Sequence, residues 1–155
     1  MSIKMLVMDV DGTLTDGHIY IGSEGEMMKA FHVQDGYAIA HILPNKGIVP
    51  VIITGRSSEI VERRAAELKI THLHQGVSDK LEKLREVASA LDVSMEEIAD
   101  IGDDVNDLEC IKCCGLTACP ADAVPVVCKA VKYVCTRNGG SGAVREFIDS
   151  FMGED

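Results

Sequence analysis

The sequence predicts an α/β protein built on one parallel sheet that is covered by helices on both faces. Short apolar runs rich in Val and Ile alternate with amphipathic helical patterns along almost the whole chain, and this alternation is typical of parallel sheets. The 155 residues, 46% of them hydrophobic and 26% charged, suit one folded domain with a sizeable core. No repeat, low-complexity tract or linker interrupts the pattern, so we expect a single domain over residues 1–155.

The chain begins with a predicted buried strand and a predicted hairpin. Residues 3–8 form an apolar run of strand length. Residues 18–22 and 26–32 alternate in the manner of strands on either side of Ser23-Glu24-Gly25, which predicts a small β-hairpin insertion.

Two helices and a second buried strand are expected next. Residues 35–45 have helical spacing, and Gly47 follows as a stop signal. Residues 49–53 form another apolar run of strand length. Ser57 or Ser58 can cap a helix that runs to residue 69.

The second half of the chain continues the alternation. Residues 78–91 predict a helix, because the following apolar side chains share one face: Leu81, Leu84, Val87, Ala88 and Leu91. Ser94 and Glu97 form a capping box for a short helix. Further strands are expected at 71–74, 98–101, 116–118 and 131–134, and further helices at 105–114, 122–129 and 142–152.

The charge and hydropathy of the chain exclude several classes of function. A net charge of −10 argues against nucleic-acid binding, which needs clustered Lys and Arg. It does not exclude a phosphorylated substrate, because a bound divalent cation supplies local positive charge. The opening residues reach Asp9 too early for a signal peptide, and the apolar run at 47–53 is too short for a bilayer. We therefore expect a cytoplasmic protein without a membrane partner.

The six cysteines invite a zinc or redox interpretation, but a structural one is favoured. Cys110, Cys113 and Cys114 stand at helical spacing on one face, where cysteine serves as a small hydrophobic residue. No histidine lies nearby in the sequence to complete a zinc site. We expect buried, reduced thiols.

Polar, glycine-rich sequence follows four of the predicted strands. These segments are Asp9-Val10-Asp11-Gly12-Thr13, Thr54-Gly55-Arg56, the stretch from Gln75 to Lys80, and Gly102-Asp103-Asp104-Val105-Asn106-Asp107. Ligands of open α/β sheets bind outside the carboxyl ends of the strands, so we expect the four segments to converge on one site.

The residue types of this site suit phosphoryl transfer. The Asp9 carboxylate can attack phosphorus, and Asp11, which points the same way if the chain is extended, can act as the proton donor and acceptor. Asp103 adds a third oxygen ligand for Mg²⁺. Thr54 and Lys80 can hold phosphate oxygens, and Gly55 lets a backbone amide approach the anion. A calcium loop is excluded, because Thr13 stands where that loop needs Asp or Asn.

These segments, in this order, resemble the four motifs of the haloacid dehalogenase superfamily of phosphatases. The resemblance covers the whole chain and implies a Rossmann-like fold, Mg²⁺, Asp9 as nucleophile and Asp11 as acid and base. It also implies that Asp11 binds the metal through its backbone carbonyl and Asp103 through its carboxylate. Asp104 and Asp107 match the supporting acidic positions, which orient Lys80 and the metal shell.

The sequence resembles more narrowly the 3-deoxy-D-manno-octulosonate 8-phosphate phosphatase subfamily, which acts in lipopolysaccharide sugar synthesis. The resemblance rests on the hairpin, Asp35-Gly36, Thr54-Gly55-Arg56, the stretch Gln75–Lys80 and the segment from Arg137 to Glu146. A sister group with nine-carbon, sialic-acid-type ulosonate 9-phosphates remains an alternative.

Substrate contacts and assembly follow from these expectations. The spacing between the motifs leaves no room for a cap domain, and the resemblance implies that hairpins and neighbouring subunits cover the site in a homotetramer. Arg56 is expected to bind the carboxylate of the sugar phosphate. Arg137, before a glycine-rich segment, is expected to offer an anion contact at the mouth of the site.

Two other classes of function were weighed against the phosphatase. A non-enzymatic receiver module shares the alternating fold and an acidic pocket, but it has no need of a second acid at Asp11. A phosphotransferase would pass the phosphoryl group to a second substrate, and the lack of a cap to exclude water favours hydrolysis.

Overall fold

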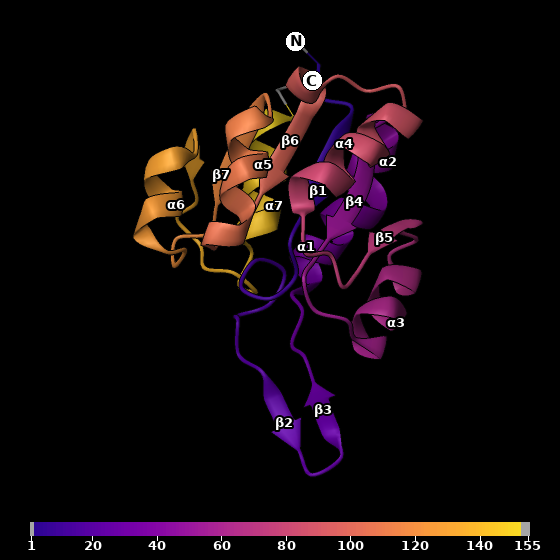
Figure 1. Cartoon of the computed structure of the whole chain (residues 1–155), viewed down its shortest axis with the longest axis vertical. Helices are drawn as coiled ribbons and strands as arrows, with labels where there is room; N and C mark the ends of the chain where they lie inside the picture. Colours follow the sequence, from indigo (N-terminus) through magenta and orange to yellow (C-terminus); the bar gives the residue numbers. More distant parts are fainter. Residues whose placement is uncertain (1, 153–155) are drawn as a thin grey trace.

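Six parallel strands form the central sheet of the computed structural model, which describes residues 2–152 (Figure 1). The strands are β1 (Met5–Met8), β4 (Val49–Ile53), β5 (His72–His74), β6 (Ile98–Ile101), β7 (Leu116–Cys119) and β8 (Tyr133–Val134). Their order is β5-β4-β1-β6-β7-β8. Met5 of the central strand pairs with Val49 on one side and Ile98 on the other. The predicted parallel sheet is therefore confirmed, with each strand within two residues of its expected start.

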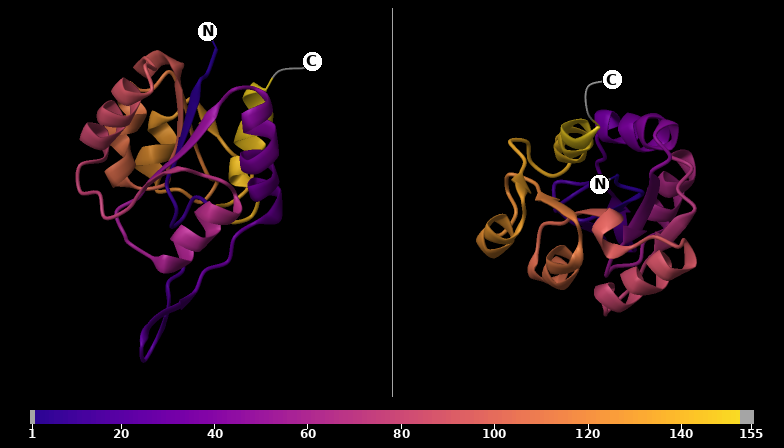
Figure 2. Two further views of the ribbon diagram at one scale, coloured as in Figure 1. Left: turned by 90° about the vertical axis from the view of Figure 1, so that its right-hand side faces the viewer. Right: turned by 90° about the horizontal axis from the view of Figure 1, so that it is seen from above.

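Helices cover both faces of the sheet, as Figure 2 shows. One face carries the helical segment 33–45 with α3 (Glu59–Glu67) and α7 (Ala143–Phe151), and its core includes Ile39 and Phe147. The other face carries α4 (Lys80–Ala90), α5 (Leu108–Cys113) and α6 (Pro125–Ala130). Burying both faces explains why the strands are continuously apolar rather than alternating.

Side-chain caps set where the helices begin. Ser58, rather than Ser57, caps α3 by accepting the amide hydrogen of Ile60, and Asp79 caps α4. The capping box of Ser94 is present, and it opens a single turn, η2 (Met95–Glu97). A second 3₁₀ turn, η3 (Val105–Asp107), precedes α5, so the helix expected at 105–114 starts with a tighter turn.

The helix expected at 35–45 is present but is not regular. It consists of α1 (Val33–Tyr37), a π-helical segment η1 (Ala38–Ile42) and α2 (Leu43–Asn45). Pro44 has no amide hydrogen, and in a regular α-helix its ring would meet the carbonyl four residues earlier. The wider π turn before it accommodates the proline.

The hairpin projects from the carboxyl end of the sheet, away from the body of the molecule (Figure 1). It consists of β2 (Tyr20–Gly22) and β3 (Gly25–Met28), and both strands are shorter than the sequence predicted. The reason is that pairing stops at Tyr20 and Met28, after which the chain turns toward the site. The hairpin side chains Ile21 and Met27 are largely exposed.

Residues 2–152 contain no cap domain over the carboxyl end of the sheet, as the spacing predicted. No helix in this range is long and apolar enough to cross a bilayer. All six cysteines are free. Cys110 and Cys114 are buried against α4 and the sheet, as expected, whereas Cys113 and Cys128 are partly exposed.

Candidate active site

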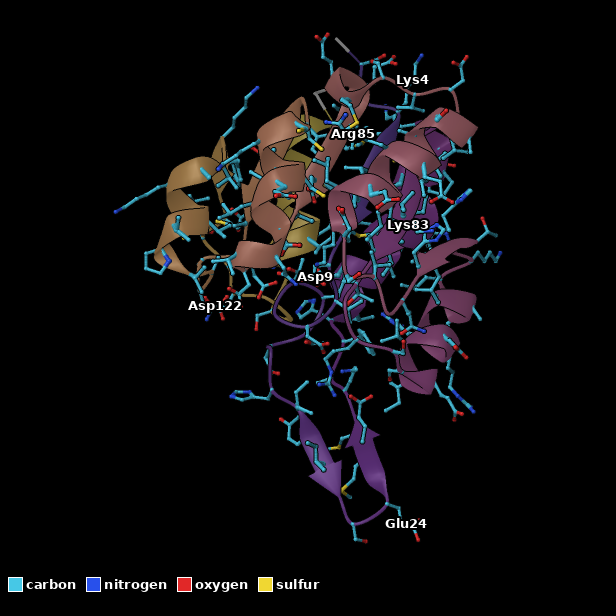
Figure 3. All side chains as sticks on the ribbon, viewed as in Figure 1. Lys4, Asp9, Glu24, Lys83, Arg85 and Asp122 are labelled. Atoms are coloured by element: carbon cyan, nitrogen blue, oxygen red, sulfur yellow. The ribbon has the colours of Figure 1, made fainter. Side chains whose placement is uncertain are left out.

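The site lies where the chain reverses its direction across the sheet. From β1 the chain runs to β4 and β5 and then returns to the other side of β1 to form β6. Such a switch point leaves a crevice at the carboxyl ends of the two adjacent strands, here β1 and β6. Asp9 follows β1 and Asp103 follows β6, so both reach this crevice. Figure 3 shows Asp9 at this end of the sheet, with Lys4 at the opposite end.

Three carboxylates meet at the switch point. One oxygen from each of Asp9, Asp103 and Asp107 lies within 4.8 Å of the others. The Lys80 ammonium lies 2.7 Å from Asp107 Oδ1 and 3.3 Å from Asp9 Oδ1. Lys80 is only 5% exposed, so solvent screens these contacts little. The sequence thus correctly predicted that Asp9, Lys80 and Asp103 would come together, with Asp107 holding Lys80.

Local hydrogen bonds hold each member of this group in place. Asp107 Oδ2 accepts the backbone N–H groups of Asp103 and Asp104 at 3.0 and 3.3 Å. The Thr13 hydroxyl donates to Asp103 Oδ1 at 3.0 Å. Lys80 is fixed as the first residue of α4, directly after the capping residue. The group is therefore preorganised by the backbone of two turns.

The carboxylates of the group are difficult to ionise together. Burial raises the pKa of Asp9 to about 6, and the charge of Asp107 adds to the effect. Burial and the neighbouring Asp9 raise the pKa of Asp103 to about 8. Burial alone would lower the pKa of Lys80, but the charges of Asp9 and Asp107 outweigh it and the pKa is raised. A cluster of hard oxygen donors that lacks positive charge fits Mg²⁺.

A glycine lets the loop after β1 approach the cluster. Gly12 has φ +90°, and a Cβ built there would lie 2.0 Å from Asp103 Oδ2. Both the dihedral angle and the lack of space therefore require glycine at this position.

The chain is not extended between Asp9 and Asp11, which corrects one expectation. The carbonyl of Val10 accepts the amide hydrogens of Thr13 and Leu14 at 3.1 and 2.9 Å, so the chain turns here. The turn lets Asp11 reach a partner of its own: Asp11 Oδ1 lies 2.6 Å from Lys29 Nζ.

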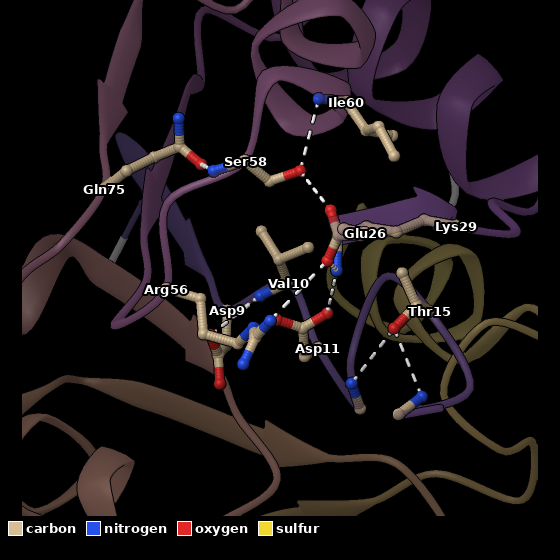
Figure 4. Close-up of polar contacts among 12 residues, drawn as sticks. Asp9, Val10, Asp11, Thr15, Glu26, Lys29, Arg56, Ser58, Ile60 and Gln75 are labelled. Carbon is tan, nitrogen blue, oxygen red and sulfur yellow. Dashed lines mark hydrogen bonds and ion pairs between the residues drawn. The ribbon is translucent and has the colours of Figure 1, made fainter. Parts of the chain in front are cut away.

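Lys29 belongs to a polar network that joins the hairpin to the body of the protein (Figure 4). Its ammonium also lies 3.0 Å from Glu26 Oε2. Glu26 in turn accepts a hydrogen bond of 2.5 Å from the Ser58 hydroxyl, and the Ser58 amide donates to Gln75 Oε1. The Lys29 side chain is 1% exposed. The network fixes Asp11 against the leg of the hairpin.

Arg56 stands at the entrance of the site. Its guanidinium lies 3.8 Å from Asp11 Oδ2 and 3.7 Å from Glu26 Oε2, and its side chain is 55% exposed. It can therefore reach a solvent-side ligand. Thr54 is buried at the end of β4, where its amide donates to the His74 carbonyl, and Gly55 follows it on the surface.

Asp104 and Arg137 belong neither to the cluster nor to the polar network of Lys29. Asp104 is exposed and caps η3 by accepting the amide hydrogen of Val105. The Arg137 guanidinium donates to Gln34 Oε1 at 2.9 Å, next to α1. The segment after Arg137 nevertheless reaches the site: a Cβ on Gly139 would lie 2.0 Å from the Gly12 carbonyl oxygen, and the Gly140 amide donates to the Thr13 carbonyl.

Sequence reasoning missed Glu26 and Lys29 as parts of the site. The available signal was a pair of opposite charges three residues apart on the second leg of the hairpin. Of the two aspartates that follow β1, Asp11 has a lysine partner of its own, Lys29.

Comparison with known proteins agrees with this geometry. A profile of haloacid dehalogenase-like hydrolases matches residues 73–148. The 3-deoxy-D-manno-octulosonate 8-phosphate phosphatases KdsC of Yersinia pestis and Escherichia coli K12 are each 45% identical over 151 residues, covering 97% of this chain and 80% of theirs.

Solved structures give the same result. The Yersinia pestis enzyme superposes with a TM-score of 0.92 at 46% identity, over 95% of this chain and 79% of that one. The Moraxella catarrhalis phosphatase, solved with magnesium ion, phosphate ion and a KDO molecule, gives 0.91 at 42% identity, over 96% and 84%. An identity of this level over nearly the whole chain shows that this protein belongs to the KdsC phosphatase family of haloacid dehalogenase-like hydrolases.

Proposed function

We propose that the protein is a Mg²⁺-dependent phosphatase that hydrolyses 3-deoxy-D-manno-octulosonate 8-phosphate through an aspartyl phosphate. The observation that carries the proposal is the group of Asp9, Asp103 and Asp107 around Lys80, in a chain 45% identical to KdsC. Residues 1–155 then form one phosphatase domain.

Asp9 is the nucleophile. It is the member of the cluster that follows the central strand, and it lies beside the Lys80 ammonium. Asp9, Asp103 and the Asp11 carbonyl would hold Mg²⁺, which would supply positive charge to the carboxylates and to the phosphoryl group. Lys80, oriented by Asp107, binds phosphoryl oxygens together with Thr54 and the Gly55 amide.

Asp11 moves the proton. It donates a proton to the sugar oxygen that leaves and later takes one from the attacking water. The Lys29 ammonium and the Arg56 guanidinium both contact the Asp11 carboxyl group and hold it in a fixed orientation. The polar network of Glu26, Ser58 and Gln75 holds Lys29 in turn.

Arg56 supports an acidic sugar phosphate as substrate. Its exposed guanidinium at the entrance suits a carboxylate at the far end of the substrate. The likeness to a phosphatase solved with KDO favours the eight-carbon substrate over a nine-carbon ulosonate 9-phosphate. Arg137 offers a second anion contact from the segment that packs on Gly12.

The hairpin supports assembly into a homotetramer. Ile21, Met27 and Met28 are 72%, 68% and 56% exposed, which is unusual for apolar side chains on a projecting ribbon. Neighbouring hairpins that cover each other would bury them and close the open site. Light scattering tests this: Ile21→Glu with Met27→Glu should give monomers, and a native assembly in that variant would contradict the proposal.

The six free cysteines fit a reducing compartment, and we infer a cytoplasmic location on that ground.

A phosphate-release screen tests the proposed function. The purified protein is assayed with Mg²⁺ against the eight-carbon ulosonate 8-phosphate, a nine-carbon 9-phosphate and glucose 6-phosphate, with chelated samples and Asp9→Asn as controls. We expect the highest kcat/KM for the first. A preference for the nine-carbon compound would select the alternative substrate, and stable phosphorylation of Asp9 without turnover would indicate a receiver-like module.

A further inference from the structure

Two cysteine sulfurs lie close together behind the Asp103 turn. Cys119 ends β7 and Cys128 lies in α6, and their Sγ atoms are 3.7 Å apart, with the Cys119 thiol donating to Cys128. Cys128 also donates to the Ala123 carbonyl oxygen at 3.5 Å. Both thiols are free. The mechanism above uses neither of them.

The two thiols differ in their access to solvent. Cys119 is fully buried, whereas Cys128 is partly exposed. Burial also raises the pKa of Cys119 to about 12, so this sulfur remains a protonated thiol. A small oxidant can therefore react first at Cys128. Cys119 must lose its proton to react in turn, and its sulfur is 3.7 Å from that of Cys128.

The other cysteines lack this arrangement. Cys113 is the other partly exposed thiol, and its contact is with the Arg85 guanidinium at 4.0 Å. Cys135 is buried and donates to the Ala143 carbonyl oxygen. Among the cysteines, all of which the structure describes, a sulfur–sulfur hydrogen bond is found between Cys119 and Cys128 alone.

We propose that Cys119 and Cys128 form a peroxide-sensitive pair whose oxidation to a disulfide slows the phosphatase. Hydrogen peroxide first converts the Cys128 thiol into a sulfenic acid and releases one water. The Cys119 sulfur then attacks the Cys128 sulfur. The S–S bond forms, the S–O bond breaks, and the Cys119 proton leaves with the hydroxyl as a second water. Two thiols are oxidised and one peroxide is reduced to two waters.

The segment between the two cysteines is attached to the active site. The Val124 amide donates to the Asp103 carbonyl oxygen at 3.0 Å, and Asp122 accepts the amide hydrogen of Gly139 at 3.1 Å. A disulfide requires the sulfurs to approach to about 2.05 Å, which draws α6 toward the end of β7. This movement displaces the turn that holds Asp103, and with it a predicted Mg²⁺ ligand.

The experiment combines mass spectrometry with two functional measurements. After peroxide treatment of the full-length protein, intact mass should fall by two hydrogens, and a digest should contain a peptide linked through Cys119 and Cys128. The Mg²⁺ concentration needed for half of the maximal thermal stabilisation should rise at least threefold. Phosphate release should slow by a similar factor, and dithiothreitol should reverse both effects.

Matched variants separate this pair from general oxidation. Cys128→Ser should abolish the linked peptide and the functional changes, whereas Cys135→Ser should retain them. Absence of the linked peptide, or a linked protein with unchanged Mg²⁺ response, would overturn the proposal. The mass and Mg²⁺ measurements need no substrate, so they decide the matter even if the proposed phosphatase activity is not found.

Discussion

The cluster at the end of the sheet and the network at the hairpin differ in how many cations face their acidic groups. In the cluster, Asp9, Asp103 and Asp107 share the single ammonium of Lys80, which leaves two negative charges when all three carboxylates are ionised. In the network, Asp11 and Glu26 face two cations, Lys29 and Arg56, and the charges cancel.

The consequence appears in the pKa values. Burial raises the pKa of Asp9 and Asp103, because too little positive charge lies nearby. Burial would also raise the pKa of Glu26, but hydrogen bonds from Ser58 and Lys29 outweigh it and the pKa is lowered. The cluster therefore lacks a double positive charge, the charge of Mg²⁺, whereas the network is complete without an ion. We infer that one region carries out the chemistry and the other positions the proton donor and the substrate.

The largest effect is expected from removing the nucleophile. Asp9→Asn should lose essentially all turnover, because a neutral amide is a poor nucleophile. It should remain folded, since the neutral side chain relieves repulsion in the cluster. Phosphate release and circular dichroism check both statements, and turnover near that of the wild type would refute the aspartyl-phosphate mechanism.

Replacing Asp11, the proposed proton donor in the network, should have the next largest effect on turnover. Asp11→Asn should slow turnover by about 10²–10⁴-fold, the usual contribution of a positioned proton donor. A pH profile of kcat separates this from a folding defect. Wild-type rates across the pH range would remove Asp11 from the mechanism.

The two buried lysines offer a direct comparison of the regions. Lys80→Met should lower kcat about 10²–10³-fold, because its charge acts on the reacting phosphoryl group. Lys29→Met should lower kcat less, since it acts only through Asp11. Equal losses, with both variants folded by circular dichroism, would show that the network takes a direct part in the chemistry.

Arg56 should alter selectivity more than rate. Arg56→Ala should lower kcat/KM for the ulosonate phosphate about 10-fold, as expected for one charged hydrogen bond, and should hardly affect an aryl phosphate without a carboxylate. The two substrates are assayed in parallel. Equal losses would assign Arg56 to the phosphate or to the fold.

The smallest effect is on stability against pH. Because the folded-state pKa values of Asp9 and Asp103 lie above the ordinary 3.8, their contribution to stability is complete at low pH and is lost as pH rises through about 6 and 8. Metal-free protein should therefore melt at lower temperature at pH 8.5 than at pH 5, by about 2–4 °C per kcal/mol. Added Mg²⁺ should reduce this fall in melting temperature. The Asp103→Asn variant should lose the part of the fall that occurs near pH 8.

Sequence patterns predicted the sheet and the cluster because both depend on local signals. Thr54 follows β4 and Gly102 follows β6, and Asp9 and Asp103 lie within two residues of the ends of β1 and β6, which must meet. The pattern could not predict that Lys29 would pair with Asp11, because that contact depends on where the hairpin leg turns after Met28. Nor could it place Arg137, whose contact with Gln34 joins α1 to the segment before α7.

The packing of Gly139 and Gly140 on the loop from Gly12 to Thr15 has a consequence for protein synthesis. The loop from Gly12 to Thr15 leaves the ribosome directly after β1, whereas Gly139 and Gly140 leave only after β8. The strand before that loop, β1, can pair on both sides only after β4 and β6 have been synthesised. Because contacts so distant in sequence form late, the nascent chain should acquire its Mg²⁺ site only after Gly140 has emerged.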